Sequence, residues 1–268
     1  MTDISSAQNP HIKDLVRLRD RRHRDRSGRF VIEGYRELGR AIEAGLPIET
    51  LYVCPELFLG SNEPALIASI EATGTAVTTV SEQAFRKASY RDRPEGLLAT
   101  APQPPAGLDR IEVSGVPLLL VVESIEKPGN LGTMLRTADA AGVRGVIVCD
   151  PTTDLYNPNV VRASLGMLFV VPVAVASTAD TVAFLRRHHI RTVATTPSTS
   201  LLHWDADLTG PIAVIVGTEQ YGLSDAWLRA ADSAVRIPMA GRADSLNAAM
   251  AAGVVLFEAA RQRAQPPR

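Results

Sequence analysis

Cysteine is scarce in this sequence, and neither cysteine has metal-binding partners nearby. Cys54 and Cys149 lie far apart in the 268-residue chain, without a Cys or His at ligand spacing. Such a pair argues against a zinc site or a disulfide framework. The five histidines form no recognisable ligand set, which disfavours a metal-dependent hydrolase. We expect two buried thiols in a reducing compartment and no metal.

Long apolar runs are also missing. The longest are residues 116–122 and residues 167–176, the second interrupted by Pro172. Neither approaches the roughly 20 residues that a membrane span needs. Residues 1–10 are polar and lack the apolar core of a secretory signal. These absences predict a cytoplasmic protein without a membrane partner.

No sign of charge dominates the composition. The chain has 28 Lys and Arg against 29 Asp and Glu, a net charge of −1. This balance alone argues against nucleic-acid binding, but a sum can hide a basic segment. Residues 13–29 contain eight Lys or Arg and only three Asp. We interpret them as an Arg-rich helix that contacts a polyanion, with a solvated charged helix as the alternative.

A proline-rich segment divides the sequence in two. Residues 100–115 read TAPQPPAGLDRIEVSG, a composition typical of an extended connection. We therefore predict a first domain at residues 1–106, a linker at 107–115 and a second domain at 116–268.

Both parts have the pattern of α/β units. In the first, we expect strands at residues 30–32, 51–53 and 77–80 and helices at 36–44 and 66–72. In the second, continuous apolar runs predict strands buried on both faces. We expect these strands at residues 116–122, 146–148, 167–173, 191–194, 212–216 and 234–237, and helices at 131–141, 179–188, 224–231 and 245–261. This alternation predicts an α/β fold with a mainly parallel sheet.

A first motif follows one of these strands and begins a helix. Residues 126–136 read EKPGNLGTMLR. Asn130 is expected to cap the helix, because its side chain can accept from free amides of the first turn. Arg136 lies away from the buried stripe of the helix. Taken alone, this could be an ordinary capped helix with a surface arginine.

A second motif follows a buried strand. Residues 214–224 read VIVGTEQYGLS, so Glu219 lies in a loop between Gly217 and Gly222. Ligands of open α/β sheets bind beyond the carboxyl ends of strands. The spacing G-x-E-x-x-G is not the G-x-G-x-x-G of dinucleotide folds, which disfavours a nucleotide-dependent oxidoreductase. An ordinary turn is the alternative.

A third motif precedes the last helix. Residues 237–250 read IPMAGRADSLNAAM. Asp244 or Ser245 can cap this helix. Asn247 is expected in its first turn, where an amide offers both a donor and an acceptor. An ordinary capped helix is again the alternative.

Taken together, in this order and spacing, the three motifs resemble those of the SpoU (TrmH) family of RNA ribose 2′-O-methyltransferases in the SPOUT superfamily. The resemblance covers residues 116–263. Residues 9–10, the Arg-rich stretch and residues 30–34 resemble the L30e-like substrate-binding domain that many members carry.

The resemblance implies a SPOUT domain with a trefoil knot at the C-terminus and a smaller L30e-like α/β domain at the N-terminus. It also implies S-adenosyl-L-methionine as cofactor and a homodimer formed through the C-terminal domain. By motif position, the cofactor would be held by Gly217, Ile237, Met239 and Leu246, and the catalytic residues would be Asn130, Arg136, Glu219, Ser245 and Asn247. Arg136 could serve as general base or as electrostatic stabiliser. Glu219 could anchor its loop or orient Arg136.

The implied substrate is RNA, with 23S ribosomal RNA preferred over transfer RNA. A non-catalytic RNA-binding protein of the same fold is a further alternative. Housekeeping modification and antibiotic resistance stay equally open. The predicted RNA contacts are Arg21, Arg22, Arg24, Arg26, Arg91 and Arg93. Tyr35, Phe85 and Tyr90 could stack on bases, although core packing is the better expectation for each.

Overall fold

The computed structural model describes residues 2–264 and divides them into two compact units. The first contains the described residues up to Pro104 together with Asp154–Val170. The second contains Pro105–Thr153 and the described residues from Val171 onward. The predicted domain limits at residues 106 and 116 do not include this exchange of residues 154–170, and they stay a prediction.

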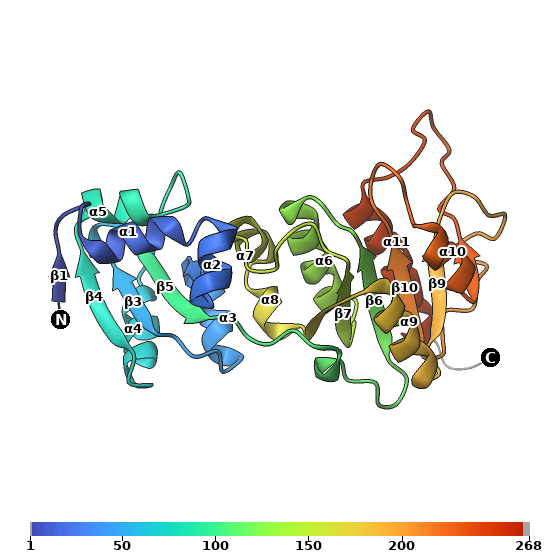
Figure 1. The fold of residues 1–268 in the computed structure, drawn as a ribbon, viewed down its shortest axis with the longest axis horizontal. Helices are drawn as coiled ribbons and strands as arrows, with labels where there is room; N and C mark the ends of the chain where they lie inside the picture. Colours follow the sequence, from blue (N-terminus) through green and yellow to red (C-terminus); the bar gives the residue numbers. More distant parts are fainter. Residues whose placement is uncertain (1, 265–268) are drawn as a thin grey trace. The chain divides into compact units, whose positions relative to one another are not determined.

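The first unit has a mixed five-stranded sheet in the order β1-β4-β3-β5-β2 (Figure 1). Its strands are β1 (Thr2–Ile4), β2 (Arg29–Glu33), β3 (Thr50–Val53), β4 (Ala76–Val80) and β5 (Leu97–Pro102). β4 is parallel to both β1 and β3, whereas β5 runs antiparallel to β3 and β2. The accompanying helices are α1 (Pro10–Arg17), α2 (Arg21–Ser27), α3 (Tyr35–Glu43), α4 (Glu63–Glu71), α5 (Glu82–Ala88), α7 (Pro158–Ser164) and α8 (Met167–Val170).

Local sequence explains the start of the Arg-rich region. The Asn9 side chain accepts from the His11 amide and Pro10 begins α1, a favourable pairing for a helix N-terminus. Ile12 and Leu15 then point into a core shared with Phe85 of α5. Asp20 caps α2 and Gly28 ends it with a positive φ of 65°. The predicted helix is therefore two short helices.

The second unit has a six-stranded sheet in the order β11-β9-β10-β6-β7-β8, with every pairing parallel (Figure 1). Its strands are β6 (Leu118–Glu123), β7 (Gly145–Cys149), β8 (Val173–Ala176), β9 (Arg191–Thr195), β10 (Ile212–Val216) and β11 (Ser233–Val235). Its helices are α6 (Pro128–Ala140), α9 (Thr178–Arg187), α10 (Asp225–Ala230) and α11 (Ala248–Ala264). The parallel α/β sheet predicted for this part is confirmed.

Side chains along the central strands point alternately to the two faces of the sheet, so this unit has a core on each face. Leu119 and Val121 of β6 face Trp227 of α10 and Leu185 of α9. Their neighbours Leu120 and Val122 are equally buried and point to the opposite face. There α11 packs on α6 and β10, and a Cβ atom on Gly253 would be in van der Waals contact with the Thr137 Cγ2 atom. Both faces are covered, which is why these strands read as continuous apolar runs.

Three elements differ from the predictions. Residues 167–170 form α8 rather than a strand, and β8 starts only at Val173. Gly166, with a φ of 85°, turns the chain before α8. The apolar residues of α8 then pack against α3. Lys127, not Asn130, is the N-cap of α6. The last helix begins at Ala248 and is capped by Asn247, so neither Asp244 nor Ser245 caps it.

Several short elements were not predicted at all, namely β1, β5, α5 and α7. The start of the proline-rich segment pairs with β2 as the end of β5. Among residues 2–264, no helix is both long enough and apolar enough to cross a membrane. The trefoil knot implied by the resemblance stays a prediction.

Candidate functional site

The three motifs meet at the carboxylate of Glu219. One oxygen, Oε2, accepts from the Lys127 ammonium. The other, Oε1, accepts from the side-chain amides of Asn130 and Asn247. The Asn247 Nδ2 atom also lies 3.2 Å from the Asn130 Oδ1 atom. We call these four residues the Glu219 cluster.

Sheet topology brings the cluster together. β6 and β10 are adjacent and parallel, so the segments that follow their carboxyl ends emerge side by side. Lys127 and Asn130 belong to the turn and helix after β6, and Glu219 to the loop after β10. Asn247 caps α11, which packs on α6, by accepting from the Ala249 amide at 3.0 Å. The cluster therefore lies where ligands bind in open α/β sheets.

The loop that carries Glu219 is a tight turn. Thr218 and Gly222 exchange backbone hydrogen bonds of 3.0 and 3.1 Å. Gly222 has a φ of 68°, which favours glycine. A Cβ atom on Gly217 would lie 2.1 Å from the Gly222 carbonyl oxygen, so no other residue fits there without moving the backbone.

A buried carboxylate anchors the far end of this loop. Glu123, the last residue of β6, is buried and accepts from the Ser224 amide at 2.8 Å. Ser224 in turn caps α10, since its hydroxyl oxygen accepts from the Trp227 amide. The loop is thus tied at its start by Gly217, at its middle by Glu219 and at its end by Ser224.

The carboxyl group of Glu219 is ionised at neutral pH. The hydrogen bond from Lys127 is the main cause that lowers the pKa of Glu219, with Asn130 as a further donor. The carboxylate therefore stays an acceptor for its three donors well below pH 7. Lys127 itself is largely exposed. It is the member of the cluster that the sequence analysis missed, and its place directly before Pro128 in the first motif was the available signal.

Two predicted catalytic residues lie apart from the cluster. Arg136 is exposed on α6, and no hydrogen bond or ion pair is recorded for it within residues 2–264. The contacts recorded for Glu219 anchor its loop, and the alternative that it orients Arg136 stays a prediction. Ser245 is exposed in the segment before α11, also without a recorded partner in the described chain. Their catalytic roles stay predictions.

The predicted cofactor residues differ in exposure. Gly217 is buried, Ile237 and Met239 are half-buried, and Leu246 is exposed. For residues 237–246 the described structure records no hydrogen bond to a backbone amide. Such a segment has free donors and acceptors next to apolar side chains, a combination that suits an adenine and its ribose.

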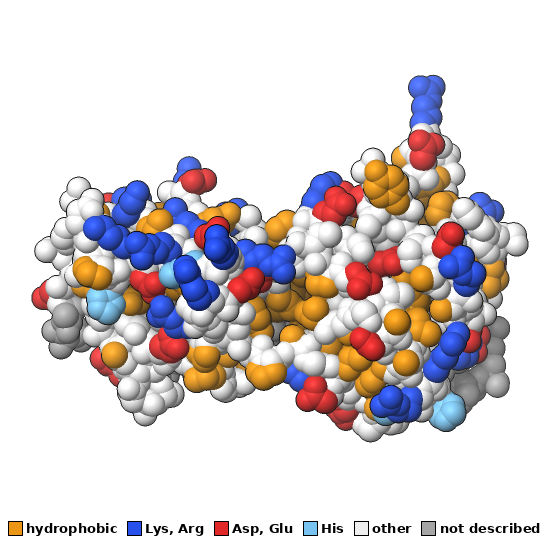
Figure 2. Space-filling view, in the orientation of Figure 1, with side chains coloured by type: hydrophobic (Ala, Val, Ile, Leu, Met, Phe, Trp, Pro, Cys, Tyr) orange, Lys and Arg blue, Asp and Glu red, His pale blue; other side chains and the backbone are white. Residues whose placement is uncertain are grey.

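The predicted RNA-binding arginines separate into two groups. Arg21, Arg22, Arg26 and Arg93 are exposed, and Arg21 lies 3.6 Å from the Asp25 carboxylate. Figure 2 shows Lys and Arg side chains gathered over α1 and α2 of the first unit. Arg24, however, is 1% exposed and donates to the carbonyls of Leu18 and Arg19 and to Asp154. Its guanidinium is not available to RNA, which corrects the prediction for this residue.

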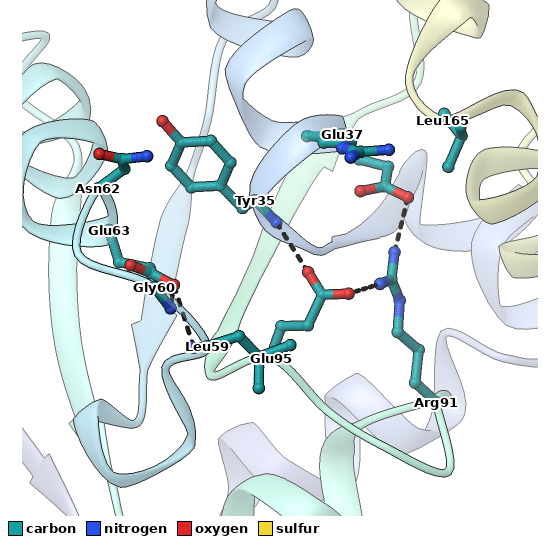
Figure 3. A pocket seen from close by; sticks show the side chains of 10 residues that line it. Tyr35, Glu37, Leu59, Gly60, Asn62, Glu63, Arg91, Glu95 and Leu165 are labelled. Atoms are coloured by element: carbon teal, nitrogen blue, oxygen red, sulfur yellow. Dashed lines mark hydrogen bonds and ion pairs between the residues drawn. The ribbon is translucent and has the colours of Figure 1, made fainter.

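Arg91 is also held internally, beside a polar cavity of about 380 Å³ in the first unit (Figure 3). Its guanidinium pairs with Glu95 and, at 2.6 Å, with Glu37, and donates to the Glu33 carbonyl at 2.9 Å. Burial raises the pKa of Glu37, against the lowering effect of Arg91. Arg91 therefore organises the end of β2 and is removed from the set of RNA contacts.

The three aromatic residues considered for base stacking lie in different surroundings. Phe85 is 1% exposed and belongs to the core, as expected. The Tyr90 hydroxyl accepts from the Asn159 amide at 2.9 Å, and the Arg19 guanidinium lies 6.0 Å from its ring centroid. Tyr35 lines the cavity of Figure 3.

Comparison with known proteins assigns both parts of the chain. Residues 117–257 match the model of the SpoU rRNA Methylase family, and residues 9–99 match an MRM3-like substrate binding domain. A 23S rRNA (uridine(2479)-2′-O)-methyltransferase of Streptomyces viridochromogenes is 34% identical over 252 residues, 92% of this chain and 87% of that protein.

Solved structures agree over nearly the whole length. A crystal structure of an RNA 2′-O ribose methyltransferase is 44% identical, covers 98% of this chain and 99% of its own, and has a TM-score of 0.87. An AdoMet-bound rRNA methyltransferase from Sinorhizobium meliloti is 35% identical, covers 97% and 98%, and has a TM-score of 0.89. Fold and motifs together define a two-domain RNA ribose methyltransferase. The chain belongs to the SpoU rRNA methylase family.

Proposed function

We propose that the chain transfers a methyl group from S-adenosylmethionine to a ribose 2′-hydroxyl of 23S ribosomal RNA in the cytoplasm. The observation that carries this proposal is the meeting of all three motifs at Glu219, beyond the carboxyl ends of β6 and β10. The relative from Streptomyces viridochromogenes and others carry 23S rRNA 2′-O-methyltransferase names, which supports ribosomal over transfer RNA.

Residues 237–246 fit the cofactor. Within residues 2–264 no hydrogen bond is recorded for their backbone amides, which can bind the adenine edge and ribose. The side chains of Ile237, Met239 and Leu246 offer apolar contact. Gly217 lets the loop after β10 fold tightly. S-adenosylmethionine supplies an electrophilic methyl group on its sulfonium. The chain's own residues supply position, because alignment of the reacting atoms accounts for much of the rate in such transfers.

The ribose hydroxyl must lose a proton and be aligned. Asn130 and Asn247, held by the Glu219 carboxylate, orient the reacting groups by hydrogen bonds. Arg136 is exposed and has no internal partner within residues 2–264, so its guanidinium is free to meet RNA. A guanidinium keeps its proton at neutral pH, so an arginine is a poor base there. We assign it to stabilising the developing alkoxide or gripping the adjacent phosphate.

Methyl transfer to transcripts tests the proposal. Purified protein with tritiated S-adenosylmethionine should label 23S rRNA and not transfer RNA. Arg136→Ala should abolish labelling while calorimetry shows cofactor binding close to wild type. Near-normal turnover in that variant would remove Arg136 from catalysis. Absence of labelling by wild type despite RNA binding would favour a non-catalytic RNA-binding protein.

We further propose that the protein works as a homodimer through its C-terminal domain. Met250 and Phe257 are seven residues apart on α11, so they share one face, and they are 60% and 52% exposed. A second copy of the helix would cover this apolar stripe. Phe257→Glu should convert a dimer to a monomer in analytical ultracentrifugation. An unchanged mass would place any dimer contact elsewhere.

A further inference from the structure

We propose that Tyr221 is a stacking platform for a nucleobase of the RNA substrate. The function proposed above uses Lys127, Asn130, Glu219 and Asn247 around the reacting groups, but it assigns nothing to this tyrosine. The inference rests on that proposed function and adds how the target nucleotide is held. Its ligand is the flat face of an unpaired base.

Tyr221 is more exposed than the other aromatic residues of its unit. It is 77% exposed, against 52% for Phe257 and 48% for Trp204, whereas Trp227 is fully buried and Phe184 is 9% exposed. No hydrogen bond of its hydroxyl is recorded in the described structure. The fold therefore gains little packing from this ring. Base–aromatic stacking is the common way in which proteins hold single-stranded or splayed-out nucleotides.

The ring is presented on a rigid support. The Tyr221 amide donates to the Thr218 hydroxyl oxygen at 3.0 Å, inside the turn closed by the Thr218–Gly222 hydrogen bonds. Glu219, two residues earlier, is held by three donors. Since the backbone on both sides is fixed, a base that stacks on the ring loses little extra freedom of the protein. Preorganised contacts of this kind cost less on binding.

The position of Tyr221 next to the Glu219 cluster suits it to hold the target nucleotide. Tyr221 is attached to the same turn as the carboxylate that orients Asn130 and Asn247. A base stacked there would have its own ribose, or that of the next nucleotide, close to these amides. Lys127 pairs with the other carboxylate oxygen, Oε2, and is a largely exposed cation that suits a phosphate. Stacking is tolerant of base identity, so Tyr221 would position the ribose rather than read the sequence.

Four variants test the ring itself: Tyr221→Phe, Tyr221→Trp, Tyr221→Leu and Tyr221→Ala. They are assayed with tritiated S-adenosylmethionine on a 23S rRNA transcript, with calorimetry of the cofactor alone. Ala and Leu should raise the KM for RNA by about 5- to 150-fold, the effect of one lost stack. Phe and Trp should keep it within about threefold of wild type. Cofactor affinity should be unchanged in all four.

Trp204→Ala is the matched control, because Trp204 is a 48% exposed aromatic residue of the same unit outside the three motifs. It should not alter the KM for RNA. The proposal is overturned if Tyr221→Ala behaves as wild type, or if Phe fails as Ala does. It is also overturned if the losses coincide with weaker cofactor binding or with a change of oligomeric mass in ultracentrifugation. Failure of wild type to methylate RNA would instead reject the proposed function.

Discussion

At the scale of single residues, Gly217 is the position most constrained by its neighbours. Any Cβ atom there meets the Gly222 carbonyl oxygen at 2.1 Å and the Leu223 amide at 2.5 Å, both backbone atoms. We expect Gly217→Ala to displace the loop and with it Glu219. Methyl transfer should fall at least 100-fold, and calorimetry should show weakened binding of S-adenosylmethionine, because a 1 Å misplacement alone can cost that much.

A matched glycine variant separates this effect from general damage. A Cβ atom on Gly39 of α3 meets nothing within 4 Å. Gly39→Ala should therefore keep full activity, and its helix should be slightly more stable. Full activity in Gly217→Ala would show that the loop relaxes without cost.

Burial lowers the reactivity of the two cysteine thiols. Burial raises the pKa of Cys149 and of Cys54 to about 12, and Glu56 beside Cys54 adds to the effect there. Both side chains are fully buried. A raised pKa means that the neutral thiol persists far above pH 8, so little thiolate is present to react.

We therefore expect native protein to resist Ellman's reagent at pH 8 and denatured protein to react at both cysteines. The count of released thionitrobenzoate with and without guanidinium chloride measures this. Rapid labelling of native protein would contradict the burial and would indicate local opening near β3 or β7.

The sequence predicted which residues belong to the site, but not which side chains are buried. Asn130, Glu219 and Asn247 come from three separate motifs of one family and do contact one another. A run of charges cannot show which member turns inward, because only two residues along α2 separate buried Arg24 from exposed Arg26. Asp154, the partner that holds Arg24 in place, is 130 residues away.

At the scale of elements, this arginine joins two distant pieces of chain. Arg24 of α2 pairs with Asp154 just before α7, and Asp154 also accepts from the Tyr156 amide at 2.8 Å. Both side chains are nearly inaccessible to water. Arg24→Met leaves the Asp154 charge buried without its partner, and breaking such pairs costs about 3–5 kcal/mol.

Urea unfolding monitored by circular dichroism measures this loss. Arg26→Met is the control, because Arg26 is an exposed residue of the same helix and should change the free energy of unfolding by less than about 0.5 kcal/mol. Equal stability of the two variants would mean that Asp154 finds another partner or water.

Elements were predicted well where apolar periodicity was long and poorly where it was short. The central strands β6 and β10 are long apolar runs and lie where expected. Residues 167–170 are apolar too, but a four-residue run has no period that separates strand from helix. Tertiary contact decides it: Phe169 packs on Phe30, with ring centroids 5.9 Å apart.

At the scale of the whole molecule, charge distribution matters more than the net charge of −1. The exposed cations on α1 and α2 form a local basic surface (Figure 2). We expect RNA affinity to fall steeply with salt, since phosphate contacts release counterions. Arg22→Ala with Arg26→Ala should weaken binding of a 23S rRNA transcript and flatten the slope of log K against log salt by about 1.4–1.8.

Filter binding between 50 and 300 mM salt gives both quantities. Asp20→Asn raises the charge at the cap of α2 by one, where the double variant lowers the charge by two, and serves as the control of opposite direction. An unchanged slope in the double variant would exclude α2 from the RNA contact. The sequence alone could not define this RNA-binding surface, because it gave no sign that Arg24 and Arg91 are held inside the first unit while the other predicted arginines are exposed.

The exchange of residues 154–170 means that the chain passes between its two units three times, near residues 104, 153 and 170. A protease that clips only the proline-rich connection therefore produces two fragments on a denaturing gel that still elute together. The later fragment keeps Phe169 and Tyr156 inserted against Phe30 of the earlier one, with the Tyr156 and Phe30 rings 4.7 Å apart. Separating the two fragments requires unfolding of the first unit. A single cleavage in the proline-rich connection therefore does not release this unit from the rest of the protein.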